Sequence, residues 1–309
     1  MIMNILAIDI GGTFIKYGLV DDQGNITEKG KMSTPKTNFE DMAETLKGIV
    51  LKVRETDTAF EGVALSIPAP VDVHTGIIHG EGSLPFLLNR SLKTALSKSV
   101  KLPVSCENDG NCAALAEMWV GAGKNYRDMV LIVCGTGIGG AIVKDRKIHH
   151  GKHLYAGEFG YGIHQYQYND GKIKIWSDLA STGSLVRNLA KKLEISESDL
   201  SGEIVFNMAS AGNALAIEEI DRFFMGMAIG IHNIQYYYDP ELILLGGAIC
   251  TRTDFIEKIE AKLTLIYESL GNPKAVPNLS VCQFENDANL VGAAYHFSHI
   301  VVFSTTWVD

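Results

Sequence analysis

Short apolar runs separated by glycine turns alternate along the chain with apolar positions at helical spacing. In the first third, apolar runs predict strands at residues 4–10, 14–20, 26–32, 62–67 and 102–107. Helical spacing predicts helices at 38–55, where Asn38 can act as the N-terminal cap, at 91–99 and at 110–119. Strands that alternate with helices are typical of an α/β fold.

The second half of the chain repeats this pattern after a boundary at residues 121–123. A strand at 129–134, a glycine-rich turn at 135–140 and a return strand at 141–143 echo the opening strand–turn–strand unit. A loop-rich stretch at 149–175 follows. Further strands are predicted at 242–245 and 279–284, and helices at 184–193, 202–209, 213–237, 253–270 and 289–298. Two similar units far apart in the chain indicate a duplicated plan.

Charge and cysteine content narrow the class of protein. The chain has 309 residues and a net charge of -9, and its sequence holds no basic cluster of the kind that binds nucleic acid. No apolar run is long enough to span a membrane, and Asp9 interrupts the first one, so no signal peptide is expected. The five cysteines are scattered without a CxxC pair, which is typical of reduced thiols in a cytoplasmic protein.

The first glycine turn, Gly11-Gly12-Thr13, follows Asp9 at the end of a predicted strand. Adjacent glycines leave backbone N–H groups uncovered, and such turns suit phosphate oxygens. A carboxylate beside phosphate needs a divalent cation between them, so the stretch fits a magnesium–nucleotide site. An ordinary hairpin with a surface acid fits this stretch equally well. Two further glycine turns after strands, at residues 135–140 and 246–247, favour the nucleotide site.

A second polar cluster, Glu107 to Asn111, lies between a predicted strand and a predicted helix. Asp109 fits two roles there. It can cap the helix, or it can be a base at the carboxyl end of a strand that accepts the proton of a hydroxyl during phosphoryl transfer. Asn108 can hold another hydroxyl.

Five motifs follow one another along the chain. They are Asp9-Ile10-Gly11-Gly12-Thr13, Glu107-Asn108-Asp109-Gly110-Asn111, Gly135-Thr136-Gly137-Ile138-Gly139-Gly140, Gly157-Glu158-Phe159-Gly160 and Leu245-Gly246-Gly247. Their order and spacing over residues 6–297 resemble the signature of the ROK family of bacterial sugar kinases. The resemblance implies the actin-like ATPase fold, a ribonuclease H-like architecture of two α/β domains around a cleft. The small domain is expected at residues 1–118 with a C-terminal helix at 290–309, and the large domain at 119–289.

By this resemblance the protein is an enzyme that uses ATP and Mg²⁺ to phosphorylate the 6-hydroxyl of a hexose or β-glucoside, with Asp109 as general base. The implied sugar-binding residues are Asn108, Glu158, Tyr161, Ser66, Pro68 and Ala69. The implied nucleotide-binding residues are Asp9, Gly11, Gly12, Thr13, Lys16, Gly135, Thr136, Gly137, Gly246 and Gly247, with Asp9 acting on magnesium indirectly. Lys16 fits a phosphate contact and an exposed strand lysine equally.

The chain departs from the family pattern after Glu158. Tyr161 stands where the family usually has histidine, and no cysteine occurs between Cys134 and Cys250, so the family's structural zinc is not expected. Residues 166–176 replace the zinc loop. Ser177 stands at about the position of a family glutamate that binds the sugar, which leaves room for a substituent on carbon 1 or for an N-acetyl group.

These departures resemble the branch of the family that holds β-glucoside kinases and N-acetylmannosamine kinases. The family also contains sugar-responsive transcriptional regulators, whose helix-turn-helix precedes the first glycine hairpin. With a strand predicted from residue 4, no such segment is expected here. A cytoskeletal or chaperone-like ATPase of the same fold is disfavoured by the sugar motifs at residues 107–109 and at Glu158. Family members are commonly dimers, so a homodimer that binds a small sugar is expected.

Overall fold

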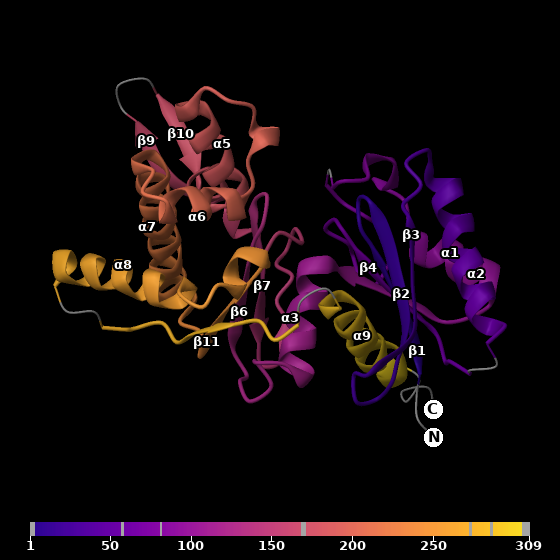
Figure 1. The fold of residues 1–309 in the computed structure, drawn as a ribbon. Coiled ribbons are helices and arrows are strands. Elements are labelled where there is room, and N and C mark those ends of the chain that lie inside the picture. The colour runs from indigo at the N-terminus through magenta and orange to yellow at the C-terminus, as the bar shows by residue number, and fades with distance from the viewer. Residues whose placement is uncertain are drawn as a thin grey trace. The chain divides into compact units, whose positions relative to one another are not determined.

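The computed structural model describes residues 4–56, 59–80, 82–167, 171–271, 274–284 and 287–304, and these form two compact units (Figure 1). Unit 1 comprises residues 1–125, 150–155 and 286–309, and unit 2 comprises residues 126–149 and 156–285. The chain therefore leaves unit 1, enters unit 2, returns to unit 1 for six residues, and re-enters it after residue 285. The boundary expected after residue 118 falls inside a helix of unit 1.

Unit 1 is a five-stranded sheet with helices on both faces (Figure 1). Its strands are β1 (Ile5–Ile10), β2 (Phe14–Val20), β3 (Ile26–Ser33), β4 (Val63–Ile67) and β5 (Val104–Asn108), in the order β3-β2-β1-β4-β5. Its helices are α1 (Phe39–Arg54), α2 (Leu92–Val100), α3 (Asp109–Val120) and α9 (Ala288–Ser304). Strands β1, β4 and β5 are parallel, so their carboxyl ends meet at one edge.

Successive side chains of β1 point to opposite faces of the sheet, which decides what each face packs against. Leu6, Ile8 and Ile10 share a core cluster with residues of α1 and α2. Ile5 and Ala7 share another cluster with residues of α3 and α9. Asp9 has the same parity as Ile5 and Ala7, so its side chain lies on the α9 face.

Unit 2 repeats this plan. Its main sheet has the order β12-β11-β6-β7-β8, in which β6 pairs antiparallel with β7 and parallel with β11. The strands are β6 (Met129–Cys134), β7 (Ile138–Lys144), β8 (Lys147–Ile148), β11 (Leu242–Gly246) and β12 (Leu279–Val281). The helices are α4 (Trp176–Ala180), α5 (Thr182–Leu193), α6 (Gly202–Ser210), α7 (Ala214–Tyr238) and α8 (Phe255–Leu270). The matching strand orders confirm the duplicated plan.

Three sequence predictions need correction. Gly139 and Gly140 belong to β7, because the antiparallel ladder with β6 begins at Ile138 and the turn is correspondingly shorter. The strand expected at 279–284 ends at Val281. The stretch expected to be loop-rich contains a second sheet, the hairpin β9 (Ile163–Gln167) and β10 (Lys172–Ile175).

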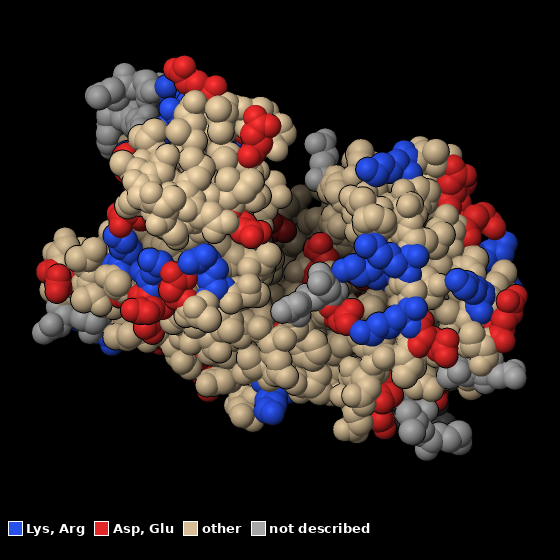
Figure 2. Space-filling view, viewed as in Figure 1, with Lys and Arg blue, Asp and Glu red and all other residues tan. Residues whose placement is uncertain are grey.

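Charged side chains of both signs are interspersed over the face shown in Figure 2. Several lie in exposed ion pairs, such as Arg90 with Glu40 and Arg222 with Glu218. Within the described residues, no helix has the length and apolar character needed to cross a bilayer.

Candidate functional site

Asp9 is the buried penultimate residue of β1, near the edge where the parallel strands finish. It accepts hydrogen bonds from Ser66 Oγ at 2.8 Å and from Asn289 Nδ2 at 3.0 Å, and both reach the same oxygen, Oδ1. No described residue donates to Oδ2. Burial raises the pKa of Asp9 above its ordinary value, while these two bonds and the charge of Lys16 act against that rise.

The glycine turn after Asp9 is held open by bonds to the backbone outside it. Gly11 N–H donates to the carbonyl of Phe14 at 3.0 Å. Thr34 holds the turn from the other side, because its hydroxyl donates to the Gly11 carbonyl at 2.6 Å and its N–H to the Thr13 carbonyl at 3.0 Å. Lys16 lies opposite Asp9 in the β1–β2 register, so it is a partly buried neighbour of the acid.

The candidate base is set on the first turn of α3. Asn108 caps this helix by accepting the N–H of Asn111 at 3.1 Å, so the cap is Asn108 and Asp109 is the first helical residue. Asn108 Nδ2 also donates to Asp109 Oδ1 at 2.9 Å and to the Ala69 carbonyl at 3.3 Å. The half-buried Asp109 is thereby fixed beside the loop that carries Pro68 and Ala69, and an acid in the first turn of a helix is stabilised in its charged form.

Glu107 is fully buried behind this turn, in register with Ser66 on the neighbouring strand. One oxygen accepts the N–H of Asn108 at 2.7 Å and the amide of Asn111 at 2.9 Å, and the other contacts His150 Nε2 at 2.7 Å. Burial is the largest single influence and opposes the charged form, but the bond and charge of His150, the charge of His296 and the bond from Asn111 together hold the pKa of Glu107 below its ordinary value. The contact between Glu107 and His150 could not be predicted from the sequence, because His150 lies in an irregular segment far from Glu107 along the chain.

The second glycine turn lies in unit 2, between β6 and β7. A side chain added at Gly135 would meet no atom within 4 Å, and the Gly135 N–H donates to the Gly137 carbonyl at 2.9 Å. Ser177 Oγ accepts the N–H of Ile138 at 3.0 Å, and Gly183 in the first turn of α5 donates its N–H to the Gly135 carbonyl at 3.2 Å. Ser177 and Gly183 thus fix the turn, and Gly183 was not among the predicted residues.

The third glycine turn ends β11, the parallel neighbour of β6. Gly247 has φ +104°, a region that favours glycine, and a Cβ there would lie 2.1 Å from the Cys134 carbonyl oxygen. Gly246 pairs in register with Val133. The structure therefore brings the turns at Gly135 and Gly247 to neighbouring strand ends within unit 2.

The motif around Glu158 packs its backbone directly on β7. A Cβ at Gly157 would lie 2.7 Å from the Gly140 carbonyl, and one at Gly160 would lie 2.0 Å from the Ile138 carbonyl. The two glycines hold Glu158 half-buried, and burial raises the pKa of its carboxyl. That carboxyl has no hydrogen-bond partner among the described residues. Tyr161 is 72% exposed.

The hairpin β9–β10 lies in the stretch expected to replace the family's zinc loop. The buried Trp176, just after β10, anchors it to α7 by donating Nε1–H to the Gly226 carbonyl at 2.9 Å. Next to it, Ser177 bonds Ile138 as described, and Asp178 accepts the N–H of Ile175 at 3.2 Å. Each of these two side chains thus accepts one backbone N–H. Among the described residues, no group of three or more His, Cys, Asp or Glu side chains is placed to hold a metal ion.

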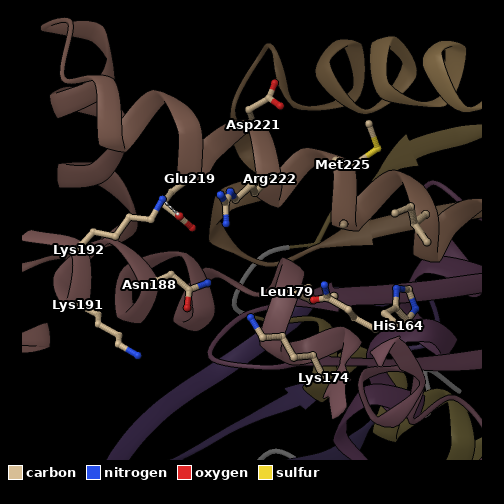
Figure 3. Close-up of a pocket in the computed structure, with 13 residues that line it drawn as sticks. His164, Lys174, Leu179, Asn188, Lys191, Lys192, Glu219, Asp221, Arg222 and Met225 are labelled. Carbon is tan, nitrogen blue, oxygen red and sulfur yellow. Dashed lines mark ion pairs between the residues drawn. The ribbon is translucent and has the colours of Figure 1, made fainter. Parts of the chain in front are cut away.

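A cavity of about 830 Å³ lies within unit 2, between the hairpin β9–β10 and helices α4, α5 and α7 (Figure 3). Its charges are partly neutralised, since Lys192 bonds Glu219 at 2.7 Å. Lys174 and Lys191 have no ion-pair partner within the described part of the chain. None of the predicted site residues lines this cavity.

Comparisons of sequence and of structure with known proteins both find ROK family proteins and sugar kinases. The chain matches the ROK family over residues 5–299. It is 30% identical to a β-glucoside kinase from Klebsiella pneumoniae, over 96% of this chain and 97% of that protein. It is similar to the structure of a ROK family protein from Streptococcus pneumoniae in complex with sucrose, with a TM-score of 0.86, 35% identity, and coverage of 99% of this chain and 100% of that one.

A third similar protein is a ROK family glucokinase from Streptomyces griseus, solved in complex with glucose and AMPPNP. The TM-score is 0.75, the identity is 26%, and the match covers 94% of this chain and 98% of that one. The two mixed sheets, each with the same strand order, and these structural neighbours show that the chain has the actin-like ATPase fold predicted from its motifs.

Proposed function

Because the chain belongs to the ROK family, as its match over residues 5–299 shows, we propose that it is an ATP-dependent sugar kinase. It transfers the γ-phosphate of ATP to the 6-hydroxyl of a hexose, and β-glucosides are its preferred class of acceptor. The observation that carries this proposal is the turn of Asn108 and Asp109, a half-buried carboxylate and amide fixed at the carboxyl edge of a parallel sheet.

Asp109 acts as the general base in this proposal. Its carboxylate accepts the proton of the sugar hydroxyl while that oxygen forms a bond to the γ-phosphorus. The bond from the same phosphorus to the β–γ bridging oxygen breaks, and ADP leaves with the electron pair. Asn108 and Glu158 hold other hydroxyls of the ring. Glu158 suits this role because its half-buried carboxyl lacks a partner among the described residues, and a sugar hydroxyl would provide one.

Asp9 fits an indirect role toward Mg²⁺. Its Oδ1 accepts both protein hydrogen bonds, which leaves Oδ2 to accept from a water bound to the ion. A single carboxylate, with no metal-binding cluster among the described residues, is what a Mg²⁺ ion bound mainly to water and phosphate requires. The ion would neutralise charge that develops on the phosphates. The N–H groups of Gly11 and Gly135 are already bonded to the carbonyls of Phe14 and Gly137, so the N–H groups assigned to phosphate oxygens are those of Gly12, Thr13, Thr136 and Gly137. Gly246 and Gly247 are assigned to the adenosine side.

The preference for β-glucosides rests on the replacement of the family's glutamate by Ser177 and Asp178 and on the similarity to the β-glucoside kinase. Both side chains are shorter than glutamate and each already accepts a backbone N–H, so this position leaves room for a substituent at carbon 1 or carbon 2. The same feature would admit an N-acetyl group, which makes N-acetylmannosamine the alternative acceptor. The homodimer and the cytoplasmic location remain predictions.

A coupled ADP-release assay decides the acceptor. Glucose, cellobiose, methyl β-glucoside and N-acetylmannosamine are compared at equal concentration, and we expect the highest kcat/KM with cellobiose or methyl β-glucoside. A higher kcat/KM with N-acetylmannosamine would show that the proposed substrate class is wrong and would leave the proposed kinase activity intact. If no sugar is phosphorylated although AMPPNP binds by calorimetry, the kinase proposal is wrong and a sugar-binding role remains.

The variant Asp109→Asn tests the base. We expect kcat to fall by about 10²–10⁴-fold, because the amide accepts no proton, while the KM for ATP stays within about threefold. Asp22→Asn is the matched control, since Asp22 is an exposed turn residue of the same unit. A kcat for Asp109→Asn equal to that of the control would remove Asp109 from this role.

A further inference from the structure

The buried carboxylate of Glu107 touches neither substrate nor solvent, yet it organises the turn that carries the candidate base. Oε1 accepts from the backbone of Asn108 and from the side chain of Asn111, both in the same turn. Asn108 in turn holds Asp109 Oδ1 through Nδ2. The orientation of the Glu107 carboxylate therefore fixes Asn108 and Asn111 directly, and Asp109 through Asn108.

The other oxygen of Glu107 is fixed by one hydrogen bond from a distant segment. His150 Nε2 lies 2.7 Å from Oε2, whereas the nearest nitrogen of His296, on α9, lies 3.7 Å away. His296 is buried, and both of its ring nitrogens lack partners among the described residues. Burial lowers the pKa of His296 to about 4, so this ring is neutral beside Glu107. His150 is thus the donor that compensates the buried charge of Oε2.

His150 belongs to the short return of the chain into unit 1. Residues 150–155 pack with unit 1, while β8 before them and Ala156 after them belong to unit 2. Gly157 and Glu158 follow directly. The bond from His150 to Glu107 attaches this crossing segment to the turn that presents Asn108 and Asp109.

We propose that His150 is a positioning residue: by holding Oε2 of Glu107 it fixes the carboxylate whose Oε1 aligns Asn108 and Asn111, and so sets the place of the Asp109 carboxylate. The chemistry assigned to Asp109 rests on the proposed function, but the ordering of the turn by His150 does not. Loss of the donor leaves a buried, half-bonded carboxylate free to turn, and a displacement of about 1 Å at a reacting group can cost about 10²-fold in rate.

The test compares His150→Leu, which removes the donor, with His150→Gln, whose side-chain amide can donate from near the Nε2 position. His149→Leu is the matched control, because His149 is the exposed neighbour. In His150→Leu we expect kcat to fall by about 10–100-fold and the KM for the sugar to rise, with the KM for ATP unchanged. His150→Gln should recover most of the loss. If His150 had only a structural role, His150→Leu would lower the melting temperature but leave kcat and both KM values unchanged at temperatures below melting.

Amide hydrogen exchange at residues 105–112 gives a readout that needs no activity. We expect faster exchange in His150→Leu, and rates near wild type in His150→Gln and His149→Leu. Unchanged exchange in His150→Leu, or equally fast exchange in His150→Gln, would overturn the proposal. If the wild type phosphorylates no sugar, the proposed function fails, and the exchange rates still decide the role of His150.

Discussion

At the scale of single residues, Glu107 and His150 make stability depend on pH. Burial lowers the pKa of His150, but the bond to Glu107 and the charges of Glu107 and Asp72 together outweigh burial, and the pKa lies above the ordinary 6.5. The folded state therefore binds this proton more tightly than the unfolded chain does, and the stability gained is complete below 6.5 and lost as pH rises through the folded pKa. The lowered pKa of Glu107 gives the opposite dependence, with stability lost as pH falls through it.

We predict that the free energy of unfolding of the wild type exceeds that of His150→Gln most at about pH 5–6 and that this difference shrinks above about pH 7. The charge of Asp72 also raises the pKa of His150, whereas His296 is neutral throughout this pH range because burial lowers its pKa to about 4. Urea titrations at a series of pH values measure the difference. A difference between wild type and His150→Gln that grows from pH 6 to pH 9 would contradict this prediction. His149→Gln, at the exposed neighbour, is the control variant.

Gly160 permits the close approach of the Glu158 motif to β7. A Cβ at this position would lie 2.0 Å from the Ile138 carbonyl and 2.3 Å from Ser177 Oγ. We predict that Gly160→Ala lowers the free energy of unfolding by about 1–3 kcal/mol through overpacking. Gly48→Ala is the control, because Gly48 lies in α1 with open space around it, and there alanine should stabilise by about 0.5–1 kcal/mol. Equal effects of the two changes in urea denaturation would contradict this interpretation.

At the scale of elements, one tryptophan fastens the hairpin β9–β10 to helix α7. Gly226 accepts the indole N–H, and a Cβ at Gly230 would lie 2.1 Å from the ring, so two glycines one helical turn apart make the groove for Trp176. His164 of β9 stacks on the same ring, with centroids 5.3 Å apart.

We predict that Trp176→Ala destabilises unit 2 by about 3–5 kcal/mol, because it leaves a cavity and removes a buried hydrogen bond. Tyr237→Ala, at a side chain of the same region that is 83% exposed, should change stability by no more than about 0.5 kcal/mol. Calorimetric melting of both variants makes the comparison. A Trp176→Ala protein as stable as the control would show that other contacts hold the hairpin.

Element by element, the sequence was most informative where a local rule applies. The cap at Asn38, the strands at both glycine hairpins and the long helix α7 follow from spacing and caps, and all are confirmed. The hairpin β9–β10 escaped prediction because its exposed Ile163, Tyr166 and Ile173 do not give the alternation of a half-buried strand. Of the two roles that the sequence allowed for Asp109, capping of α3 belongs instead to Asn108, because Asn and Asp are equally good caps and only the backbone turn distinguishes these neighbours.

At the scale of the whole chain, α9 completes the surroundings of Asp9. Its Asn289 donates to Asp9 Oδ1 from the far end of the sequence. We predict that Asn289→Ala lowers the free energy of unfolding by about 1.5–3 kcal/mol, because a buried carboxylate loses one of its two donors, and that it weakens the binding of Mg²⁺ with ATP. Asn207→Ala on the exposed face of α6 is the control. If Asn289→Ala has the same free energy of unfolding as Asn207→Ala, water replaces the lost donor without loss of stability.

The long-range contacts of the site were beyond the reach of sequence reasoning. The motifs named Asp9, Ser66, Asn108 and Asp109, and the parallel register of β1, β4 and β5 does place Asp9 beside Ser66 and Ser66 beside Glu107. The partners Asn289 and His150 come from separate passages of the chain, and a single polar residue in a helix or loop carries no pattern that identifies its partner.

The interleaved course of the chain also orders its folding during synthesis. The face of β1 that carries Ile5 and Ala7 finds its cover in Leu290, Ala293 and Phe297 of α9. Until those residues leave the ribosome, α3 is the only helix of this cluster that has been made, and part of one apolar side of the first sheet stays exposed while every strand and helix of unit 2 is synthesised. The N-terminal sheet is therefore the last to be completed.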